Sequence, residues 1–237
     1  GYVLFGLYSI LLFFMFFNLA TYRLYDYLSP ASIHHKLLVK SFLATLSICA
    51  SVLIMTFGFF EAVKKPVIKR IKIPIAGLPE TFHGVTILQL SDVHVGETIK
   101  RRFVKLIVNM SNEISPDIVV LTGDMTDGVR MQVEEELFFF KEMKAPLGKF
   151  MVPGNHEYYW GVDHWIEFWR ENGFLPLINE HHIIKKKDDQ MIMAGVHDYS
   201  AKRINQKLIS SPLASLVGAP ENVVKILLAH QPRSIYE

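Results

Sequence analysis

Two long stretches without charge constrain this chain more than any other feature. Residues 1–20 contain no charged side chain, and residues 41–60 form a second uncharged stretch. Twenty helical residues at about 1.5 Å each span roughly the 30 Å hydrocarbon core of a bilayer. Helices in a soluble core usually keep a polar face, which both stretches lack. We therefore expect a membrane anchor of two transmembrane helices within residues 1–63, and an integral membrane protein.

The charge of the chain differs between its two parts. Residues 1–72 carry a net charge of +6, and the remainder carries −4. Five basic residues and three prolines fall within residues 64–81, which we interpret as a juxtamembrane linker. Its charges either face anionic lipid headgroups or are simply solvated. The acidic balance of the remainder argues against nucleic acid as a partner.

The basic residues also predict an orientation in the membrane. The flank that follows the second apolar stretch carries five basic residues, whereas residues 21–40 carry three. Positive flanks stay on the cytoplasmic side. We therefore expect the globular domain to be cytoplasmic.

From about residue 82, short apolar runs alternate with helical patterns. Candidate strands lie at 84–92, 117–124, 148–155 and 223–231. Candidate helices lie at 101–114 and 129–142, and a third starts near Asp163 and stops at Gly173. Residues 181–198 have the pattern of a β-hairpin. The alternation predicts an α/β domain over residues 82–237, with a central sheet covered on both faces.

All four apolar runs end in side chains that can bind a metal ion. In open α/β sheets, ligands bind beyond the carboxyl ends of the strands, so four strands in one sheet would direct these side chains into one volume. Carboxylates, imidazoles and an amide oxygen, without thiolates, suit manganese, iron or zinc. Two such ions about 3.5–4 Å apart stabilise attack and departure at phosphorus. The side chains concerned are those of Asp92, His94, Asp124, Asn155 and His230.

Four motifs resemble a known family. SDVHVG, LTGDMTDG, VPGNHEYYWG and LLAHQP, in this order, resemble the calcineurin-like metallophosphoesterase superfamily. GFLPLINE, which follows the third motif, is similar to its bacterial, membrane-associated branch. The resemblance covers roughly residues 82–237. It implies a four-layer αββα sandwich around two sheets, with a dinuclear centre of two divalent metal ions (Mn, Fe or Zn).

The resemblance also implies a role for each metal ligand. Asp92 and His94 would bind the first ion. Asp124 would bridge both ions. Asn155 and His230 would bind the second ion.

The reaction implied by the resemblance is the hydrolysis of a phosphomonoester or phosphodiester. His156 would be the catalytic imidazole that contacts the phosphate, and a metal-bound hydroxide would be the nucleophile. Membrane anchoring favours a lipid-linked phosphate ester as the substrate, by proximity alone. The alternative is a catalytically silent membrane protein whose domain binds a metal or ligand without turnover.

One motif of the family is not found. The family pattern continues with a Gly-His-x-His segment that gives one further ligand to each metal. This chain reaches Glu237, seven residues after His230, without it. We therefore expect a domain that is truncated at its C-terminus.

Several other polar and aromatic residues allow either two interpretations or only a structural one. Glu157 either belongs to the site or caps the helix that follows, and His197-Asp198 either approaches the site or forms a turn. Asp127 is predicted to be the N-cap of helix 129–142. The only cysteine, Cys49, excludes intrachain disulfides and cysteine-rich zinc sites. We assign to the surface or to packing His83, His164 and Phe138–Phe140.

Overall fold

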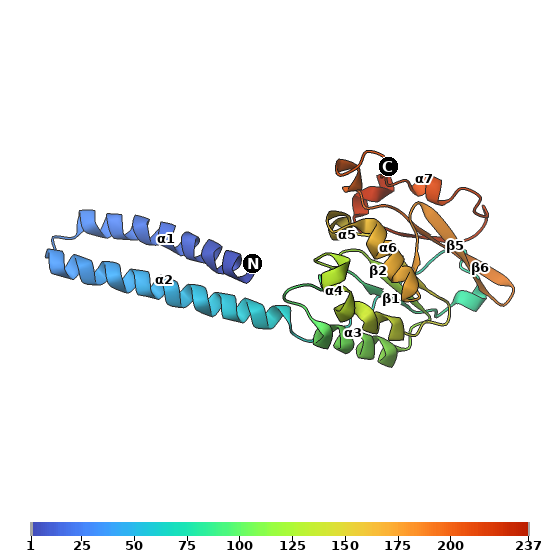
Figure 1. Ribbon diagram of the computed structural model, residues 1–237, viewed down its shortest axis with the longest axis horizontal. Coiled ribbons are helices and arrows are strands. Elements are labelled where there is room, and N and C mark those ends of the chain that lie inside the picture. Colours follow the sequence, from blue (N-terminus) through green and yellow to red (C-terminus); the bar gives the residue numbers. More distant parts are fainter. Residues whose placement is uncertain (1, 237) are drawn as a thin grey trace. The chain divides into compact units, whose positions relative to one another are not determined.

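The computed structural model of the chain describes residues 2–236 (Figure 1). The chain divides into two compact units, one ending at Lys64 and the other starting at Lys65. The first unit is helical, and the second contains all the strands.

The first unit is a hairpin of two helices, α1 (Tyr2–Leu28) and α2 (Ile33–Ala62). Both helices are long and apolar enough to cross a membrane. They extend beyond the two uncharged stretches because residues 21–28 contain neither Gly nor Pro, and the loop forms around Pro30. Most of their large apolar side chains are exposed, as expected for surfaces that face lipid.

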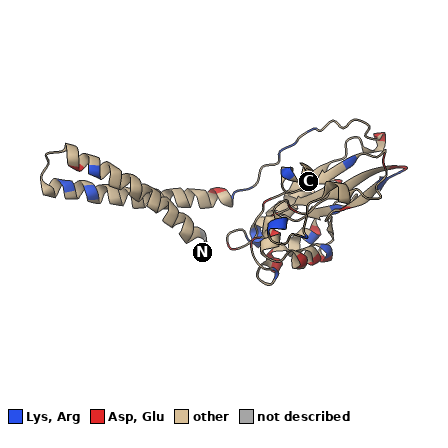
Figure 2. Cartoon of the chain, turned by 90° about the horizontal axis from the view of Figure 1, so that it is seen from above, with Lys and Arg blue, Asp and Glu red and all other residues tan. Residues whose placement is uncertain are grey.

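Polar contacts join the two helices of this hairpin. Asn18 Nδ2 donates to Ser47 Oγ at 2.6 Å, and Lys36 Nζ pairs with Asp26 Oδ1 at 2.8 Å. Figure 2 shows that the charged residues of the hairpin gather near the connecting turn, apart from Glu61 near the end of α2. The apolar middle of each helix therefore carries no charge, as a membrane span requires.

The second unit contains a parallel sheet in the order β1-β2-β3-β4. Its strands are β1 (Ile87–Leu90), β2 (Ile118–Thr122), β3 (Lys149–Val152) and β4 (Leu175–Pro176). The central strand β2 is entirely buried, because one face packs on helices and the other on a second sheet. Leu90 pairs with Leu121, and Thr122 pairs with Val152, so the first three strands end at nearly the same level.

The second sheet consists of β5 (Glu180–Lys186), β6 (Asp189–Gly195) and β7 (Lys225–Leu228). The predicted hairpin is confirmed as the antiparallel pair β5–β6, and β7 runs parallel to β6. Placing the last candidate strand in the same sheet as the first three was wrong. An apolar run indicates a strand but does not identify its neighbour, and here the free edge of β6 is the partner of β7.

The two sheets enclose the core of the domain. The first sheet contributes Ile118, Val120, Phe150 and Val152 to this core. The second sheet contributes Ile184, Met191, Met193 and Leu228. The residues between them on β2 and β3, such as Val119 and Met151, are also buried and point to the opposite face. Helices α3 (Arg101–Ile114), α4 (Arg130–Leu137) and α6 (Val162–Glu171) cover that face (Figure 1).

A short helix, α7 (Pro212–Ser215), forms the fourth layer. Ser215 O accepts from His181 Nδ1 at 2.8 Å. His182, the next residue on β5, stacks against Phe150 in the core, so His181 and α7 lie on the outer face of the second sheet. The layers are therefore α, β, β and α, and the predicted αββα sandwich is confirmed.

The helix predictions hold, with shifted boundaries. Helix 101–114 is confirmed as α3, whereas the predicted helix 129–142 is α-helical only to Leu137 and continues as the 3-10 helix η2 (Phe138–Glu142). Helix α6 begins at Val162, with Gly161 as N-cap, so Asp163 lies in its first turn instead of capping it. As predicted, α6 buries Trp165, Phe168 and Trp169.

Candidate metal centre

The loops that follow β1 and β2 run side by side. The Asp92 amide donates to Gly123 O at 3.1 Å, and the His94 amide donates to Asp124 O at 3.0 Å. Asp92, His94 and Asp124 have φ angles of 56°, 50° and 52°, in the left-handed region that non-glycine residues rarely adopt. Such backbone strain is concentrated at functional sites.

Two glycines allow three loops to approach closely beyond the strand ends. A Cβ on Gly123 would lie 2.5 Å from Gly154 N and 2.8 Å from His230 Nδ1. A Cβ on Gly154 would collide with the Asp124 side chain. His230, which follows β7 of the second sheet, thereby reaches the same volume as the ends of β2 and β3.

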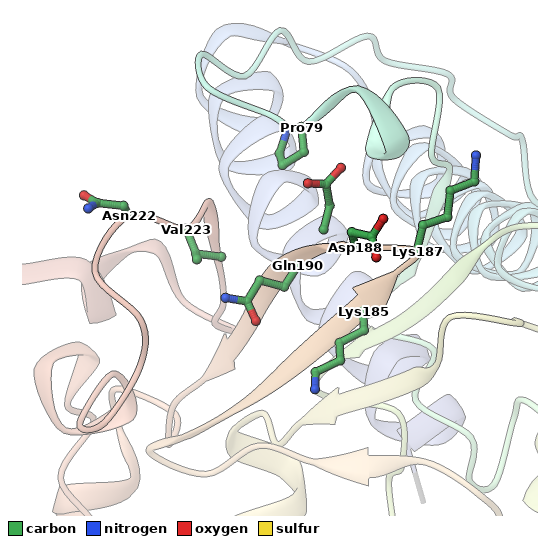
Figure 3. A pocket seen from close by; sticks show the side chains of 8 residues that line it. Pro79, Lys185, Lys187, Asp188, Gln190, Asn222 and Val223 are labelled. Carbon is green, nitrogen blue, oxygen red and sulfur yellow. The ribbon is translucent and has the colours of Figure 1, made fainter.

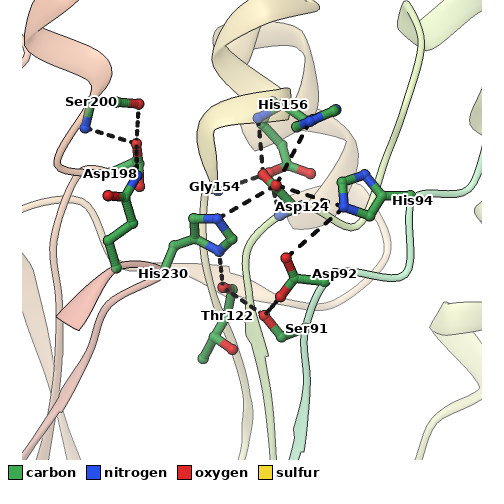
Figure 4. Close-up of polar contacts among 12 residues, drawn as sticks. Ser91, Asp92, His94, Thr122, Asp124, Gly154, His156, Asp198, Ser200 and His230 are labelled. Atoms are coloured by element: carbon green, nitrogen blue, oxygen red, sulfur yellow. Dashed lines mark hydrogen bonds and ion pairs between the residues drawn. The ribbon is translucent and has the colours of Figure 1, made fainter. Parts of the chain in front are cut away.

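Asp124 lies at the centre of this volume and is only 4% exposed. Its Oδ2 is 3.4 Å from His230 Nε2, 3.8 Å from His94 Nε2 and 3.9 Å from His156 Nε2 (Figure 4). Its Oδ1 accepts from the His156 amide at 2.9 Å. Burial alone would raise the pKa of Asp124, but the contacts with His230 and His156 outweigh it and lower the pKa.

The acidic and histidine side chains form two groups that could each hold an ion. One group is His94, Asp124 and His156, and the other is Asp92, Asp124 and His230. Within each group, the ligand atoms lie within 4.8 Å of one another. Asp124 is common to both groups, so its carboxylate is placed where it could contact two ions at once.

The surroundings of His230 fit a metal ligand. Its Nδ1 contacts Thr122 O at 2.9 Å, so this nitrogen carries a proton, and Nε2 faces Asp124 Oδ2 at 3.4 Å. Ligating histidines typically donate their other N–H in this way. Burial lowers the pKa of His230, but the hydrogen bond and charge of Asp124 outweigh it and raise the pKa to about 9. The carboxylates therefore favour positive charge at this position.

The remaining predicted residues lie around the same carboxylate. Asp92 is more exposed, and its Oδ1 is 3.9 Å from His94 Nε2. The rings of His94 and His156 have centroids 4.5 Å apart. Asn155 is the first residue of α5 (Asn155–Tyr159), directly before His156. Asp92, His94 and Asp124 thus lie on the loops after β1 and β2, Asn155 and His156 begin α5, and His230 follows β7.

Asp127 has a role that the sequence reading missed. The N-cap of α4 is Val129, so the prediction that Asp127 caps this helix was wrong. Asp127 Oδ1 instead lies 3.2 Å from His156 Nδ1 and accepts from Trp160 Nε1 at 3.2 Å. A carboxylate on Nδ1 fixes the ring of His156 with Nε2 toward Asp124. The available signal was its spacing, three residues after Asp124.

Glu157 combines the two roles that the sequence left open. It is fully buried, and its carboxylate accepts from the Gly154 amide at 2.8 Å, which caps α5. It also accepts from the amides of Asp124, Met125 and Thr126, at 2.9, 2.8 and 3.2 Å. Burial raises the pKa of Glu157 to about 7, while these N–H groups oppose the rise. Glu157 therefore holds the Asp124 turn against α5.

The His197-Asp198 pair lies close to the site without joining either ligand group. His197 Nδ1 lies 2.6 Å from the Tyr158 hydroxyl, and burial lowers the pKa of His197, so a neutral ring accepts this proton. Asp198 is buried. Surface positions for His83 and His164 are confirmed, and Phe140 packs against Trp169 in the core.

A separate hollow of about 540 Å³ lies at the other end of the second sheet (Figure 3). It is lined by residues of both charges, including Lys185 and Asp189, near the starts of β6 and β7. His230 follows the opposite end of β7, so this hollow does not belong to the candidate metal centre.

Comparison with known proteins decides the family. The family model of the calcineurin-like phosphoesterases matches residues 85–236, which include every candidate ligand. The chain belongs to this family. Its globular unit is thus a metallophosphoesterase domain, as the four motifs predicted.

Relatives of this chain occur in animals and bacteria. The chain is 32% identical to a "Transmembrane protein with metallophosphoesterase domain" from Danio rerio, over 97% of this chain and 54% of the relative. It is 33% identical to an "Uncharacterized metallophosphoesterase" from Aquifex aeolicus, over 63% of this chain and 56% of the relative. The chain spans about half the length of the curated relatives it matches. The transmembrane relatives and the apolar hairpin together indicate association with a membrane.

A shorter match is to a relative whose name states its substrate. Over 34% of this chain and 26% of the relative, the sequence is 38% identical to "UDP-2,3-diacylglucosamine pyrophosphatase LpxG" from Chlamydia trachomatis. The name gives that relative a diacylated, lipid-linked substrate.

Proposed function

We propose that the protein is a membrane-anchored hydrolase of phosphate esters that uses two divalent metal ions. Residues 1–63 would be the anchor, residues 64–81 a linker and residues 82–237 the hydrolase domain. The ions would be bound by Asp92, His94, Asp124, Asn155 and His230, with His156 acting on the substrate.

The position of Asp124 carries this proposal. A carboxylate that is 4% exposed, with three imidazole nitrogens within 3.9 Å of one oxygen, is a costly arrangement in the absence of a compensating cation or proton. Oxygen and imidazole ligands suit manganese, iron or zinc. When bound, divalent ions at such a site polarise phosphoryl oxygens and lower the pKa of bound water.

The residues of the chain itself would orient the substrate and move a proton. Asp127 Oδ1 lies 3.2 Å from His156 Nδ1, so Asp127 would hold His156 with its Nε2 facing the metal centre. From Nε2, His156 would contact the phosphate and donate a proton to the departing ester oxygen. Glu157 would keep the Asp124 turn in place.

The substrate we propose is a lipid-linked phosphate ester. Two helices that are long and apolar enough to cross a membrane would keep the domain close to lipid headgroups. The similarity to a relative named for a diacylated substrate supports the same class. Purified protein in mixed micelles should hydrolyse a phosphate ester with two acyl chains at a higher kcat/KM than its deacylated form. Equal kcat/KM values would contradict the lipid-linked substrate but not the hydrolase.

Activity itself is tested by removing and restoring metal. We expect EDTA treatment to abolish hydrolysis of an aryl phosphodiester or phosphomonoester, and Mn²⁺ to restore it. The surface variant His83→Ala is the matched control, because His83 is exposed and its side chain lies outside the candidate metal centre, with its ring nitrogen at Leu78 O. Mn²⁺ binding without turnover would support the alternative, a catalytically silent domain.

We also propose that the domain faces the cytoplasm, on the basis of the basic residues between Lys64 and Lys72. A reporter enzyme fused after Glu237 that is active only outside the cytoplasm would contradict this orientation.

A further inference from the structure

The loop after β6 carries a buried carboxylate next to the candidate metal centre. Asp198 has no exposed surface, although burying a carboxylate is expensive unless it is paired. Its Oδ1 accepts from the Ser200 amide at 2.8 Å and from the Ser200 hydroxyl. Its Oδ2 has no hydrogen-bond partner within residues 2–236. A local turn alone does not explain why a full carboxylate occupies this position.

A third contact connects Asp198 to the loop of His230. Gln231 Nε2 donates to Asp198 Oδ1 at 3.3 Å, and Gln231 directly follows His230 (Figure 4 shows Asp198 beside His230). His230 follows β7 in the second sheet but must reach Asp124, which follows β2 in the first. The loop after β7 therefore sets how His230 meets Asp124.

The same loop is also tied to α5. The Tyr158 hydroxyl contacts His197 Nδ1 at 2.6 Å, and Tyr158 lies two residues after His156. Tyr158 is only 6% exposed, so this contact is shielded from water. Residues 197–198 thereby contact both α5, which carries His156, and the loop after β7, which carries His230. Both histidines lie near Asp124.

We propose that Asp198 is a positioning residue of the metal centre, which holds the His230 loop in place through Gln231. The inference rests on the proposed metal centre. Groups that orient metal ligands without touching the ion commonly contribute 10- to 100-fold to metal affinity.

Three single variants separate this role from a role in local folding. Gln231→Met removes the donor to Asp198 at nearly constant size, and Asp198→Asn removes the charge while keeping an acceptor oxygen. Ser200→Ala is the matched control, because it breaks another bond to the same carboxylate without touching the His230 loop. The readouts are Mn²⁺ affinity by calorimetry and the thermal unfolding temperature of the metal-free protein.

We expect Gln231→Met and Asp198→Asn each to weaken Mn²⁺ binding about tenfold or more. We expect Ser200→Ala to change Mn²⁺ affinity by less than about twofold, even if it lowers the unfolding temperature. The double variant Asp198→Asn/Gln231→Met should bind Mn²⁺ no more weakly than the weaker single variant, because both changes act on one hydrogen bond, by removing its donor or the charge of its acceptor.

Two outcomes would overturn the inference, and they differ from failure of the proposed function. If the wild type binds Mn²⁺ and Gln231→Met binds it equally well, Asp198 does not act through this loop. If Ser200→Ala weakens binding as much as Gln231→Met, the carboxylate only folds its own turn. A wild type that binds no Mn²⁺ would instead refute the metal centre, and this inference with it.

Discussion

Glu157 holds the turn of Asp124 through the backbone. One carboxylate oxygen, Oε2, accepts from the Asp124 amide at 2.9 Å and from the Gly154 amide at 2.8 Å. The other, Oε1, accepts from the amides of Met125 and Thr126. The left-handed φ of 52° at Asp124 is maintained by these contacts. The strained turn at the metal centre is therefore supported by a residue whose own side chain belongs to neither ligand group.

We predict that Glu157→Gln lowers the free energy of unfolding by about 3 kcal/mol. Whichever carboxylate oxygen the amide nitrogen replaces, that nitrogen faces two backbone N–H donors instead of accepting from them. Urea denaturation of the purified protein measures the effect. The control is Glu167→Gln, which removes an exposed ion pair with Arg130 at 3.2 Å and should change stability by less than about 1 kcal/mol. Equal effects of the two variants would contradict this role of Glu157.

Replacing Asp124 and replacing His156 should have different effects on bound metal. We predict that Asp124→Asn abolishes turnover of an aryl phosphodiester and lowers the bound metal, because the carboxylate is common to both ligand groups. His156→Ala should cut turnover while most metal stays bound, if its Nε2 acts on the substrate. Metal content by atomic emission and initial rates decide between the two roles. Equal metal loss in both variants would make His156 a ligand.

Asp127→Asn should slow the reaction without emptying the site. The variant keeps an oxygen for Trp160 Nε1 but removes the charge beside His156 Nδ1, so the ring is held less firmly as a proton donor. We expect kcat to fall by at least about tenfold, with KM and metal content nearly unchanged. A KM effect alone would show that Asp127 contacts the substrate instead.

Asp117 connects the start of β2 to the start of β1 through hydrogen bonds with Thr86. Its Oδ2 accepts from the Thr86 amide at 2.8 Å and the Thr86 hydroxyl at 2.9 Å, which lowers the pKa of Asp117. A lowered folded-state pKa adds stability above the unfolded pKa of about 3.9, and this stability is lost as the pH falls through the folded value. Asp117→Asn should therefore be less stable than wild type at pH 7, with a difference that shrinks below about pH 4.

Denaturant midpoints at several pH values measure this change, with the exposed Glu113→Gln as control. A difference between Asp117→Asn and wild type that stays constant down to about pH 3 would contradict the sign given for Asp117.

The sequence predicted the elements of the domain better than their partners. The apolar runs located β1, β2, β3 and β7, although only β2 and β3 are mostly buried, and β1 and β7 keep exposed or half-buried positions. Nothing in residues 223–231 specifies that β7 pairs with β6, since the choice depends on which strand edge is free after the hairpin forms. The predicted approach of His230 to Asp124 still occurs, because the end of β7 in the second sheet brings His230 Nε2 within 3.4 Å of Asp124 Oδ2.

Individual side-chain contacts were less predictable than the ligand set. Asp127 is a residue type that often caps helices, and it lies just before a predicted helix. The three-dimensional path of the chain brings its Oδ1 within 3.2 Å of His156 Nδ1. Asp198 gave no clear signal, because a carboxylate after a strand is an ordinary turn residue. Both roles depend on contacts between residues about 30 positions apart in the sequence.

The central claim is a centre of two metal ions that share Asp124, and anomalous scattering from crystals grown with Mn²⁺ tests it most directly. We predict two anomalous peaks about 3.5–4 Å apart, on either side of the Asp124 carboxylate, with His230 Nε2 directed at one of them. A single peak, or peaks that Asp124 does not contact, would contradict the account.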